Sequence, residues 1–360
     1  MLKNCLVKSI YFIIIIFLPF SSCMATETWE KIDKRIKSQI YELNVGVKIK
    51  LENNLSVQLI DLSPTNHYPV FATSNSDKGY RVVGFGTAFP LATTRTSQAY
   101  FFTNRHVVNS CLSVIHECER FYAGLALYAK TTANGKDFNT RYNEILEIVN
   151  YGFNKSLSNS QLKLYKDTVD GIWNCYDSFL TVKADPQQNL FRQYLKIKNL
   201  NAEVGYFIHP PGDINLKPYK GKLFKVNNDE NTPDLAILTV DNASIPPLEL
   251  DLTPVCEGQE IQVIGYPTAS DQIDMDSSKY YAPTFSTGRI SRVAPRILEV
   301  DAPVSTGNSG GPVVNIKGKV VGIVAVRAIS AQGSELPNFA GAITNTCIHD
   351  FASELFQAHK

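Results

Sequence analysis

Apolar residues recur in short runs along most of this chain, and turn residues separate the runs. Within residues 45–62, Val45, Val47, Ile49 and Leu51 alternate with polar positions, a period of two that predicts one or two strands. Further strand-like runs occupy residues 69–73, 80–89, 100–103, 202–209, 222–226, 234–238, 261–266, 287–293, 296–304, 320–326 and 339–343. Many short strands joined by turns favour a β-barrel or sandwich over an alternating α/β fold.

Other segments have helical periodicity. Apolar residues at helical spacing predict an amphipathic helix in residues 26–43 that packs on the outside of the main domain. Residues 113–200 break the strand pattern and predict a largely helical insertion, and we expect its aromatic stripe to form core rather than a ligand site. A short helix is predicted within residues 346–360. The helical spacing involves Trp29, Ile32, Ile36, Ile40, Tyr142, Ile145, Leu146, Val149, Leu162, Tyr165, Val169, Ile172, Trp173, Tyr176 and Phe179.

Residues 1–25 differ in kind from the rest. Two lysines precede an apolar run over residues 10–20, and small residues follow it. This pattern predicts a secretory signal peptide, because the run is too short for an ordinary membrane span. Cleavage after Ala25 would give a soluble periplasmic or secreted product. The sequence Phe20-Ser21-Ser22-Cys23 resembles a bacterial lipoprotein processing site, so lipid anchoring through Cys23 stays open, as does a retained anchor helix.

The overall composition is that of a globular protein. Of 360 residues, 44% are hydrophobic and 19% are charged, which suits a sizeable core and excludes a disordered chain. The net charge of +1 gives no support to nucleic acid as a partner. We therefore expect a folded protein whose partners are not nucleic acids.

Five cysteines remain after the leader, an odd number for an oxidising compartment. They are Cys111, Cys118, Cys175, Cys256 and Cys347. Cys111 and Cys118 are close enough in sequence to close a small loop, and this bridge is the one we favour. Together with His116 they also suggest a metal site, but no fourth ligand stands at a matching spacing, and we expect no metal.

The stretch from Ser305 to Pro312 is the best candidate for chemistry. It places Ser309 among glycines, which permit the backbone angles that turn successive N–H groups toward one point beside a nucleophile. A surface hairpin is the alternative, because the same residue types make ordinary turns. A serine nucleophile needs a base, and His106 is the best of six histidines because it follows a strand-like run. A buried core histidine is the competing interpretation.

A histidine base needs a carboxylate that fixes its tautomer and favours the imidazolium. Asp234 opens an apolar run between His106 and Ser309, and we predict that it is this partner. An aspartate at that position can also be a simple turn residue. Asp229 and Asp241 are its rivals, and neither is placed as well along the chain.

His, Asp and Ser in this chain order resemble the arrangement of trypsin-like serine proteases. The segments 84–89, 103–108, 234–238 and 307–312 carry the resemblance, and residues 264–267 and 318–323 extend it. The likeness is strongest to the bacterial protease domain typified by HtrA proteins, and it covers roughly residues 69–112 and 202–345. It implies a mainly β fold of two antiparallel six-stranded barrels, chymotrypsin-like, with a largely helical insertion in the N-terminal half and the active site between the barrels.

The resemblance also implies the roles of individual residues. Ser309 would be the nucleophile, His106 the general base and then acid, and Asp234 its partner; no cofactor is implied. The N–H groups of Gly307 and Ser309 would form the oxyanion hole. Asn308 stands where digestive relatives have Asp, so activation by a freed N-terminus is not expected. The family's primary specificity pocket maps onto Pro303, Val304, Ile323, Val324, Ala325 and Gly341.

The domain organisation follows from these assignments. We expect a signal peptide over residues 1–25, a helix and strand extension over 26–68, a protease domain over 69–345 interrupted by the insertion at 113–200, and a helix over 346–360. No stretch is left for the PDZ domain usual in HtrA proteins.

The predicted function is an exported serine endopeptidase that forms an acyl-enzyme, with protein or peptide substrates. The apolar pocket residues predict small or medium apolar side chains before the cut. A non-catalytic binding or chaperone-like protein on the same scaffold is the first alternative, although the intact set of His106, Asp234 and Ser309 disfavours it. An esterase or lipase that uses the same chemistry is the second.

Overall fold

The computed structural model describes most of the chain after residue 27. The described ranges are 28–63, 65–93, 98–181, 200–213, 215–241, 245–268, 280–329 and 335–357. The predictions of a signal peptide and of lipid attachment at Cys23 fall on residues outside these ranges. Within them, no helix is long and apolar enough to cross a membrane, and no three His, Cys, Asp or Glu side chains gather as a metal site.

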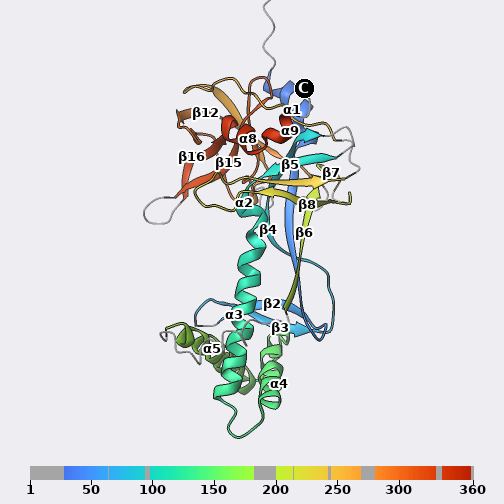
Figure 1. Ribbon diagram of the computed structural model, residues 1–360, viewed down its shortest axis with the longest axis vertical. Coiled ribbons are helices and arrows are strands. Elements are labelled where there is room, and N and C mark those ends of the chain that lie inside the picture. Colours follow the sequence, from blue (N-terminus) through green and yellow to red (C-terminus); the bar gives the residue numbers. More distant parts are fainter. Residues whose placement is uncertain are drawn as a thin grey trace, which may run out of the picture.

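The first barrel closes from six antiparallel strands (Figure 1). Around the ring they are β1 (Tyr41–Leu51), β4 (Arg81–Thr93), β5 (Ala99–Thr103), β9 (Ala236–Val240), β8 (Tyr219–Val226) and β6 (Leu200–His209), and β6 returns to pair with β1. Along β1 the buried Leu43, Val45 and Val47 alternate with partly exposed polar residues such as Asn44 and Lys48, and only Gly46, which is buried, interrupts this alternation. The period of two in the sequence therefore marks the inner face of the barrel.

The second barrel is built from the C-terminal half of the chain. Its strands in ring order are β10 (Glu260–Gly265), β12 (Thr284–Val293), β13 (Ile297–Val300), β16 (Glu335–Thr344), β15 (Val320–Ile329) and β14 (Pro312–Asn315). A separate short pair joins β7 (Gly212–Asp213) to β11 (Tyr280–Tyr281). The predicted fold class, two six-stranded antiparallel barrels, is confirmed.

The two barrels share a hydrophobic interface. On β10, Ile261 and Val263 are buried inside the second barrel, whereas Ile264 is buried in a cluster with Phe89 and Phe102 of the first barrel. The strands at this interface are thus covered on both faces, which explains why they read as nearly continuous apolar runs rather than alternating ones. The interface brings β4 and β5 of one barrel against the end of β10 of the other.

The N-terminal helix joins this interface from outside. Helix α1 (Trp29–Ile36) and the 3-10 turn η1 (Lys37–Gln39) bury Ile32 and Ile36 in the cluster between the barrels. Trp29 Nε1 donates to Glu260 Oε1 at 2.7 Å, and an Arg35 Nη donates to the Lys317 carbonyl at 2.9 Å. The amphipathic spacing predicted a packed helix over residues 26–43, and the structure has a shorter one, because strand β1 begins at Tyr41. The predicted C-terminal helix is divided into α8 (Asn345–Phe351) and α9 (Ser353–Gln357).

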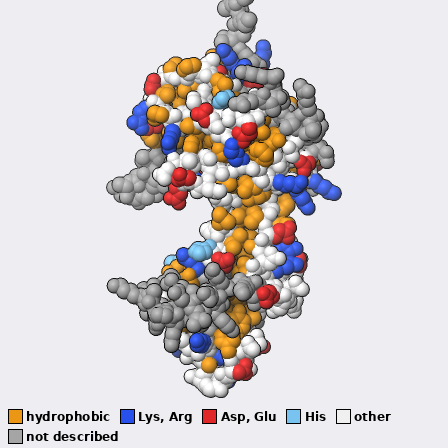
Figure 2. Space-filling view, in the orientation of Figure 1, with side chains coloured by type: hydrophobic (Ala, Val, Ile, Leu, Met, Phe, Trp, Pro, Cys, Tyr) orange, Lys and Arg blue, Asp and Glu red, His pale blue; other side chains and the backbone are white. Residues whose placement is uncertain are grey.

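The helical insertion forms a lobe that stands away from the barrels (Figure 1). After the short helix α2 (Arg105–Val108), the chain continues through α3 (Ser110–Thr131), α4 (Phe138–Val149), the 3-10 turn η2 (Asn150–Phe153) and α5 (Asn159–Thr181). Trp173 of α5 is buried, 4.5 Å from the Tyr68 ring and 5.7 Å from the Phe121 ring between centroids. The aromatic stripe therefore forms core, as predicted. Figure 2 shows the molecule narrowing between this lobe and the barrels, with hydrophobic side chains along the narrow part.

The lobe is not made of the insertion alone. The hairpin of β2 (Ser56–Leu62) and β3 (Pro69–Ser74) packs against it, and Asp170 of α5 accepts hydrogen bonds from Ser63 and Thr65 beside the hairpin. In addition, β1 belongs to the first barrel, although the predicted boundary placed it in an extension before residue 69. The boundary differed because the partner of β1 is β6, which lies beyond the whole insertion and cannot be inferred from local pattern.

The predicted disulfide between Cys111 and Cys118 is wrong. Both residues lie on α3, about two helical turns or roughly 10 Å apart along the axis, whereas bridged cysteines have Cα atoms within about 7 Å. Both side chains are buried, and all five cysteines in the described ranges are unbridged. Burial raises the pKa of the Cys111 thiol and of the Cys118 thiol.

The buried thiols lead to a direct prediction. In protein without residues 1–25, Cys111 and Cys118 should resist alkylation in the native state, because a buried thiol of raised pKa forms little thiolate. Cys256, which is exposed, should react at once and serves as the internal control. After unfolding without reductant all five thiols should take up the reagent, as counted by peptide mass. A peptide pair linked through Cys111 and Cys118 would contradict the structure.

Candidate active site

His106 stands at the junction of the first barrel and the helical lobe. Strand β5 ends at Thr103, and the fully buried Asn104 follows, whose Nδ2 donates to the Asp234 carbonyl at 2.8 Å. His106 is then the second residue of α2, and its side chain is 48% exposed. The strand end thus delivers the imidazole to the surface instead of into the core, and the competing interpretation as a core histidine does not hold.

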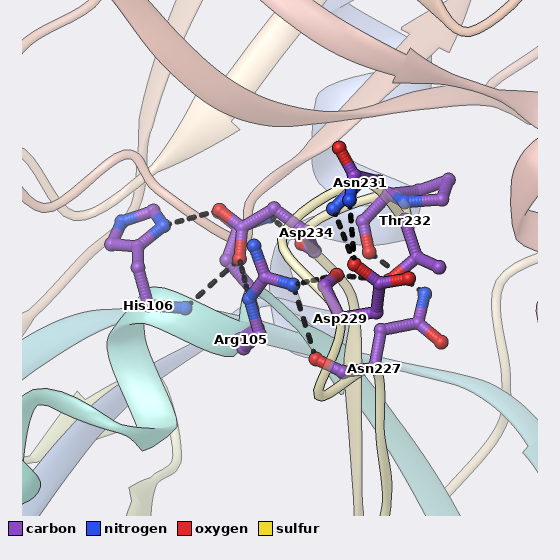
Figure 3. Close-up of polar contacts among 9 residues, drawn as sticks. Arg105, His106, Asn227, Asp229, Asn231, Thr232 and Asp234 are labelled. Carbon is purple, nitrogen blue, oxygen red and sulfur yellow. Dashed lines mark hydrogen bonds and ion pairs between the residues drawn. The ribbon is translucent and has the colours of Figure 1, made fainter.

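The carboxylate of Asp234 contacts His106 twice (Figure 3). Its Oδ1 accepts the backbone N–H of His106 at 2.9 Å, and its Oδ2 lies 2.5 Å from Nδ1 of the ring. An ionised carboxylate can only accept, so Nδ1 carries the proton and Nε2 presents its lone pair outward. The two contacts hold both the position and the tautomer of the imidazole.

Asp234 is held in its ionised form. Burial raises the pKa of this carboxyl, but the hydrogen bonds and charge of His106 and the nearby Arg105 guanidinium oppose burial and outweigh it. The net result is a pKa below the ordinary value for Asp, so the side chain is a carboxylate at neutral pH. The site thus places a fixed negative charge against the imidazole.

Arg105 supports this carboxylate from the other side (Figure 3). One Nη donates to the carbonyls of Asn227 and Asp229 at 3.2 and 2.6 Å, and Nε lies 3.8 Å from Asp234 Oδ1. The Asp229 side chain accepts hydrogen bonds within its own turn, from the backbone and side chain of Asn231. Arg105 therefore pins the loop that carries Asp234.

The rival carboxylates are engaged elsewhere. In the part of the chain that the structure describes, Asp229 makes no contact with His106, because its side chain accepts hydrogen bonds from Asn231 in its own turn. Asp241 pairs with Lys222 at 2.7 Å and accepts from Gln98 at 2.7 Å on the barrel surface. Of the three aspartates considered from sequence, Asp234 is the one placed against His106.

The loop before β14 has backbone angles that only glycine adopts easily. Gly307 has φ of +98° and Gly310 has φ of +84°. A Cβ on Gly307 would stand 2.1 Å from the Tyr266 carbonyl oxygen, and one on Gly310 would stand 2.3 Å from Thr103 Oγ1. Neighbouring backbone therefore approaches this loop so closely that side chains are excluded at both positions.

Two amides of this loop are available to a ligand. Across the described ranges, the backbone N–H groups of Gly307 and Ser309 donate to no protein acceptor, whereas Asn308 N donates to the Ser305 carbonyl and Gly310 N to the Val324 carbonyl. Gly307 is buried and Ser309 half-buried. Two unpaired donors beside a serine hydroxyl are what an oxyanion-binding site requires.

Ser309 and His106 are carried on touching elements. Thr87 N of β4 donates to the Ser309 carbonyl at 2.8 Å. A Cβ on Gly86 would stand 2.9 Å from both that carbonyl oxygen and the Val107 side chain, which is next to His106. The Ser309 hydroxyl itself makes no hydrogen bond with the described residues.

The predicted pocket residues fall into two groups. Val324 is joined to the Ser305–Pro312 loop by backbone hydrogen bonds of 2.9 Å in both directions, but its side chain and that of Ile323 are fully buried in core clusters. Pro303 is exposed, and the remaining members, Val304, Ala325 and Gly341, are half-buried. The side chains of Ile323 and Val324 therefore contribute to core packing and are not exposed to a substrate.

Sequence reasoning gave no role to Thr87, Asn104 or Arg105, which hold this site together. Each lies inside a motif already noted, one in the Gly84–Phe89 segment and two directly before His106. Their bonds run to backbone carbonyls of distant loops, so no spacing rule could identify them. The position of Arg105 next to a candidate base, in a chain segment with no other cation, was the available signal.

Comparisons with known proteins relate part of the chain to serine proteases. Residues 203–323 match the family of trypsin-like peptidase domains. This match includes Asp234 and Ser309, and His106 lies before it, on the other side of the insertion. A Do-like HtrA serine protease of Lactobacillus helveticus is 30% identical over 149 residues, 38% of this chain and 34% of that protein. A serine protease of Mycobacterium tuberculosis is 31% identical over 126 residues, 33% of this chain and 32% of the relative.

Parts of the chain are therefore similar to HtrA-type, trypsin-like serine proteases. The chain spans about a third of the length of the curated relatives it matches. Among solved structures, a serine endoprotease of Yersinia pestis is 14% identical with a TM-score of 0.43, covering 92% of this chain and 67% of that one. The HtrA-type relationship was predicted from the motifs, and the comparisons confirm it.

Substitution of Arg105 should affect stability more than substitution of an exposed arginine that does not contact the Asp234 loop. Arg105→Met should lower the free energy of unfolding by about 1.5–3 kcal/mol, because charge-assisted hydrogen bonds to two carbonyls are lost. It should also raise the pKa of Asp234. A carboxyl whose pKa is lower in the folded than in the unfolded protein stabilises the fold at pH values above its unfolded-state pKa, and this stabilisation is lost as the pH falls through the folded-state pKa. Because the folded-state pKa of Asp234 should be higher in Arg105→Met, the variant should lose this stabilisation at a higher pH than the wild type.

Urea unfolding between about pH 3 and 7 measures both effects. Arg289→Met is the matched control, because Arg289 is an exposed arginine of the second barrel. Equal unfolding curves for the two variants would show that Arg105 does not pin the Asp234 loop.

Proposed function

We propose that this protein is a serine endopeptidase that uses Ser309, His106 and Asp234. The observation that carries the proposal is the Asp234 carboxylate, which bonds both the backbone N–H and the ring Nδ1 of His106. The second support is the loop beside it, in which Ser309 lies between glycines and two backbone amides have no protein acceptor. An oriented base and a preformed anion site together match acyl transfer.

The reaction follows from these positions. Ser309 Oγ attacks the carbonyl carbon of the scissile bond while its proton passes to His106 Nε2, and Asp234 stabilises the resulting imidazolium. The carbonyl oxygen becomes an oxyanion held by the N–H groups of Gly307 and Ser309. Each such donor contributes about 10²–10³ in rate. The imidazolium then gives its proton to the leaving amine, and the acyl-enzyme remains.

Deacylation repeats these steps with water as the nucleophile. His106 takes a proton from water, which attacks the acyl carbon, and the second oxyanion occupies the same pair of amides. The proton then returns from His106 to Ser309 Oγ as the acid product leaves. The Ser309–His106 hydrogen bond that starts acylation forms when substrate is bound, since catalytic hydrogen bonds are often long in free enzymes.

For specificity, we propose small or medium apolar side chains before the cut. The residues assigned to the pocket, among them Val304, Ala325 and Gly341, bring no charge to it. A charged substrate side chain would lose its hydration there without gaining a partner. Export to the periplasm or medium belongs to the same proposal and rests on the pattern of residues 1–25.

One observation favours a second candidate, a binding protein without catalysis. The Ser309 hydroxyl makes no hydrogen bond with the described residues, so the nucleophile and the base are not joined in this structure. A chaperone-like protein would use the same cleft to hold unfolded chains. Covalent reactivity at Ser309 distinguishes the two candidates.

The first test is labelling with a fluorophosphonate probe. The intact protein should form a covalent adduct at Ser309 near neutral pH, because an activated serine attacks the phosphorus and the adduct oxygen enters the anion site. Ser309→Ala should abolish the adduct, and Asp234→Asn should slow it by roughly 10⁴ because the wrong tautomer of His106 is favoured. Peptide mass locates the label.

Ser305→Ala serves as the matched serine control in the same loop and should keep the label. A folded protein that stays unlabelled between about pH 6 and 9 would remove the endopeptidase proposal and favour the binding protein.

The specificity proposal has a separate test. A peptide library incubated with the protein should yield cleavage mainly after small and medium apolar residues, read from the new termini by mass spectrometry. Incubation with Ser309→Ala identifies background cleavage. Strong preference for Lys, Arg, Asp or Glu before the cut would show that the pocket is not formed by the apolar residues assigned to it.

A further inference from the structure

Thr87 lies where three parts of the molecule meet. It belongs to β4 of the first barrel and is fully buried. Its hydroxyl donates to the Gly307 carbonyl in the Ser305–Pro312 loop at 2.8 Å and accepts the N–H of Tyr266, just after β10 of the second barrel, at 3.0 Å. The donor and an acceptor of this one hydroxyl are thus both engaged.

The backbone of Thr87 bonds the same loop. Its N–H donates to the Ser309 carbonyl at 2.8 Å, and its own carbonyl accepts Thr103 Oγ1 at 2.8 Å. One residue therefore holds the carbonyl groups on both sides of Asn308. These two contacts orient the peptide groups that follow Gly307 and Ser309.

These contacts matter because Gly307 cannot hold its own geometry. At φ of +98° a glycine has no side chain to restrict rotation, so its peptide groups turn unless partners fix them. The N–H groups of Gly307 and Ser309 belong to peptide groups adjacent to those that Thr87 bonds. Rotation of either bonded group would change the direction of an unpaired N–H.

The hydroxyl has no substitute in its surroundings. A Cβ on Gly265 would stand 2.8 Å from Thr87 Oγ1 and 3.1 Å from the Asn308 backbone, so the space is closed to a replacing side chain. The loop is buried at Gly307 and Asn308, so it has little access to solvent that could replace the bond. Loss of the hydroxyl leaves the Gly307 carbonyl without this donor.

We propose that Thr87 is a positioning residue whose hydroxyl sets the direction of the oxyanion-binding N–H groups of Gly307 and Ser309. This inference rests on the proposed endopeptidase function. It goes beyond that function because it states that a residue of the first barrel, Thr87, determines the backbone geometry of a loop in the second half of the chain. Thr87 touches no substrate and acts through the loop.

The experiment compares three variants by fluorophosphonate labelling of Ser309. Thr87→Val keeps the shape and removes the hydroxyl, Thr87→Ser keeps the hydroxyl, and Thr239→Val removes another buried threonine hydroxyl of the first barrel, which bonds the Lys222 carbonyl. The second-order rate constant for labelling should fall roughly 10²-fold in Thr87→Val, as for a small misplacement of catalytic groups. Thr87→Ser and Thr239→Val should stay near the wild-type rate.

The rate constant and the labelled fraction must be read separately. A merely structural role lowers the fraction of protein that labels, in proportion to unfolding, and leaves the rate constant of the folded molecules unchanged. The positioning role lowers the rate constant at full final labelling. Circular dichroism at the assay temperature gives the folded fraction of each variant, and Thr87→Ala replaces Thr87→Val if the latter does not fold.

The outcomes are distinguishable. An unlabelled wild type removes the proposed function itself. A labelled wild type with an unchanged rate constant in Thr87→Val removes only the role of Thr87. An equal loss in Thr87→Ser and Thr87→Val also overturns that role, because the hydroxyl would then not be the group that matters.

Discussion

The close approach of strand β4 to the Ser305–Pro312 loop is the constraint on which the rest of the site depends. The two backbones are in direct contact there, because the N–H of Thr87 donates a hydrogen bond to the Ser309 carbonyl. Residue 86 is a glycine, and a side chain at that position would collide with the same carbonyl. The contact requires both barrels to be closed and docked, since β4 and the loop belong to different barrels. The hydrophobic interface around Ile264, Phe89 and Phe102 supplies that docking.

Much of the fold could be predicted because burial leaves a period in the sequence. Alternating residues marked β1, and the helical spacing of residues 162–179 marked α5 with Trp173 in its core. The His106–Asp234 contact was also within reach, because each residue flanks a recognisable strand. These features are local, and a local pattern is what a single sequence records.

The remaining features depend on contacts between distant segments. Nothing in the sequence near Val45 indicates that β1 pairs with β6, which follows the insertion. The short spacing of Cys111 and Cys118 suggested a disulfide, but both residues lie on α3, where the helix holds them too far apart. The roles of Arg105 and Thr87 also cannot be predicted from the sequence. Both side chains donate to backbone carbonyls of distant loops, and those carbonyls come within reach only in the folded protein. Side-chain type alone predicts a donor and not its acceptor.

The pairing of β1 with β6 has a consequence for how the molecule forms. Register joins Glu42 to His209 and Leu51 to Leu200, so these partners flank the entire helical lobe in the chain. Contacts of such large sequence separation form slowly, because the entropy of closing the intervening loop is lost before they stabilise anything. Contacts among α3, α4 and α5 are nearer in sequence and carry less of that cost. Folding of the lobe therefore shortens the loop between β1 and β6 that must close, and it brings β6, β8 and β9 of the first barrel within reach of β1.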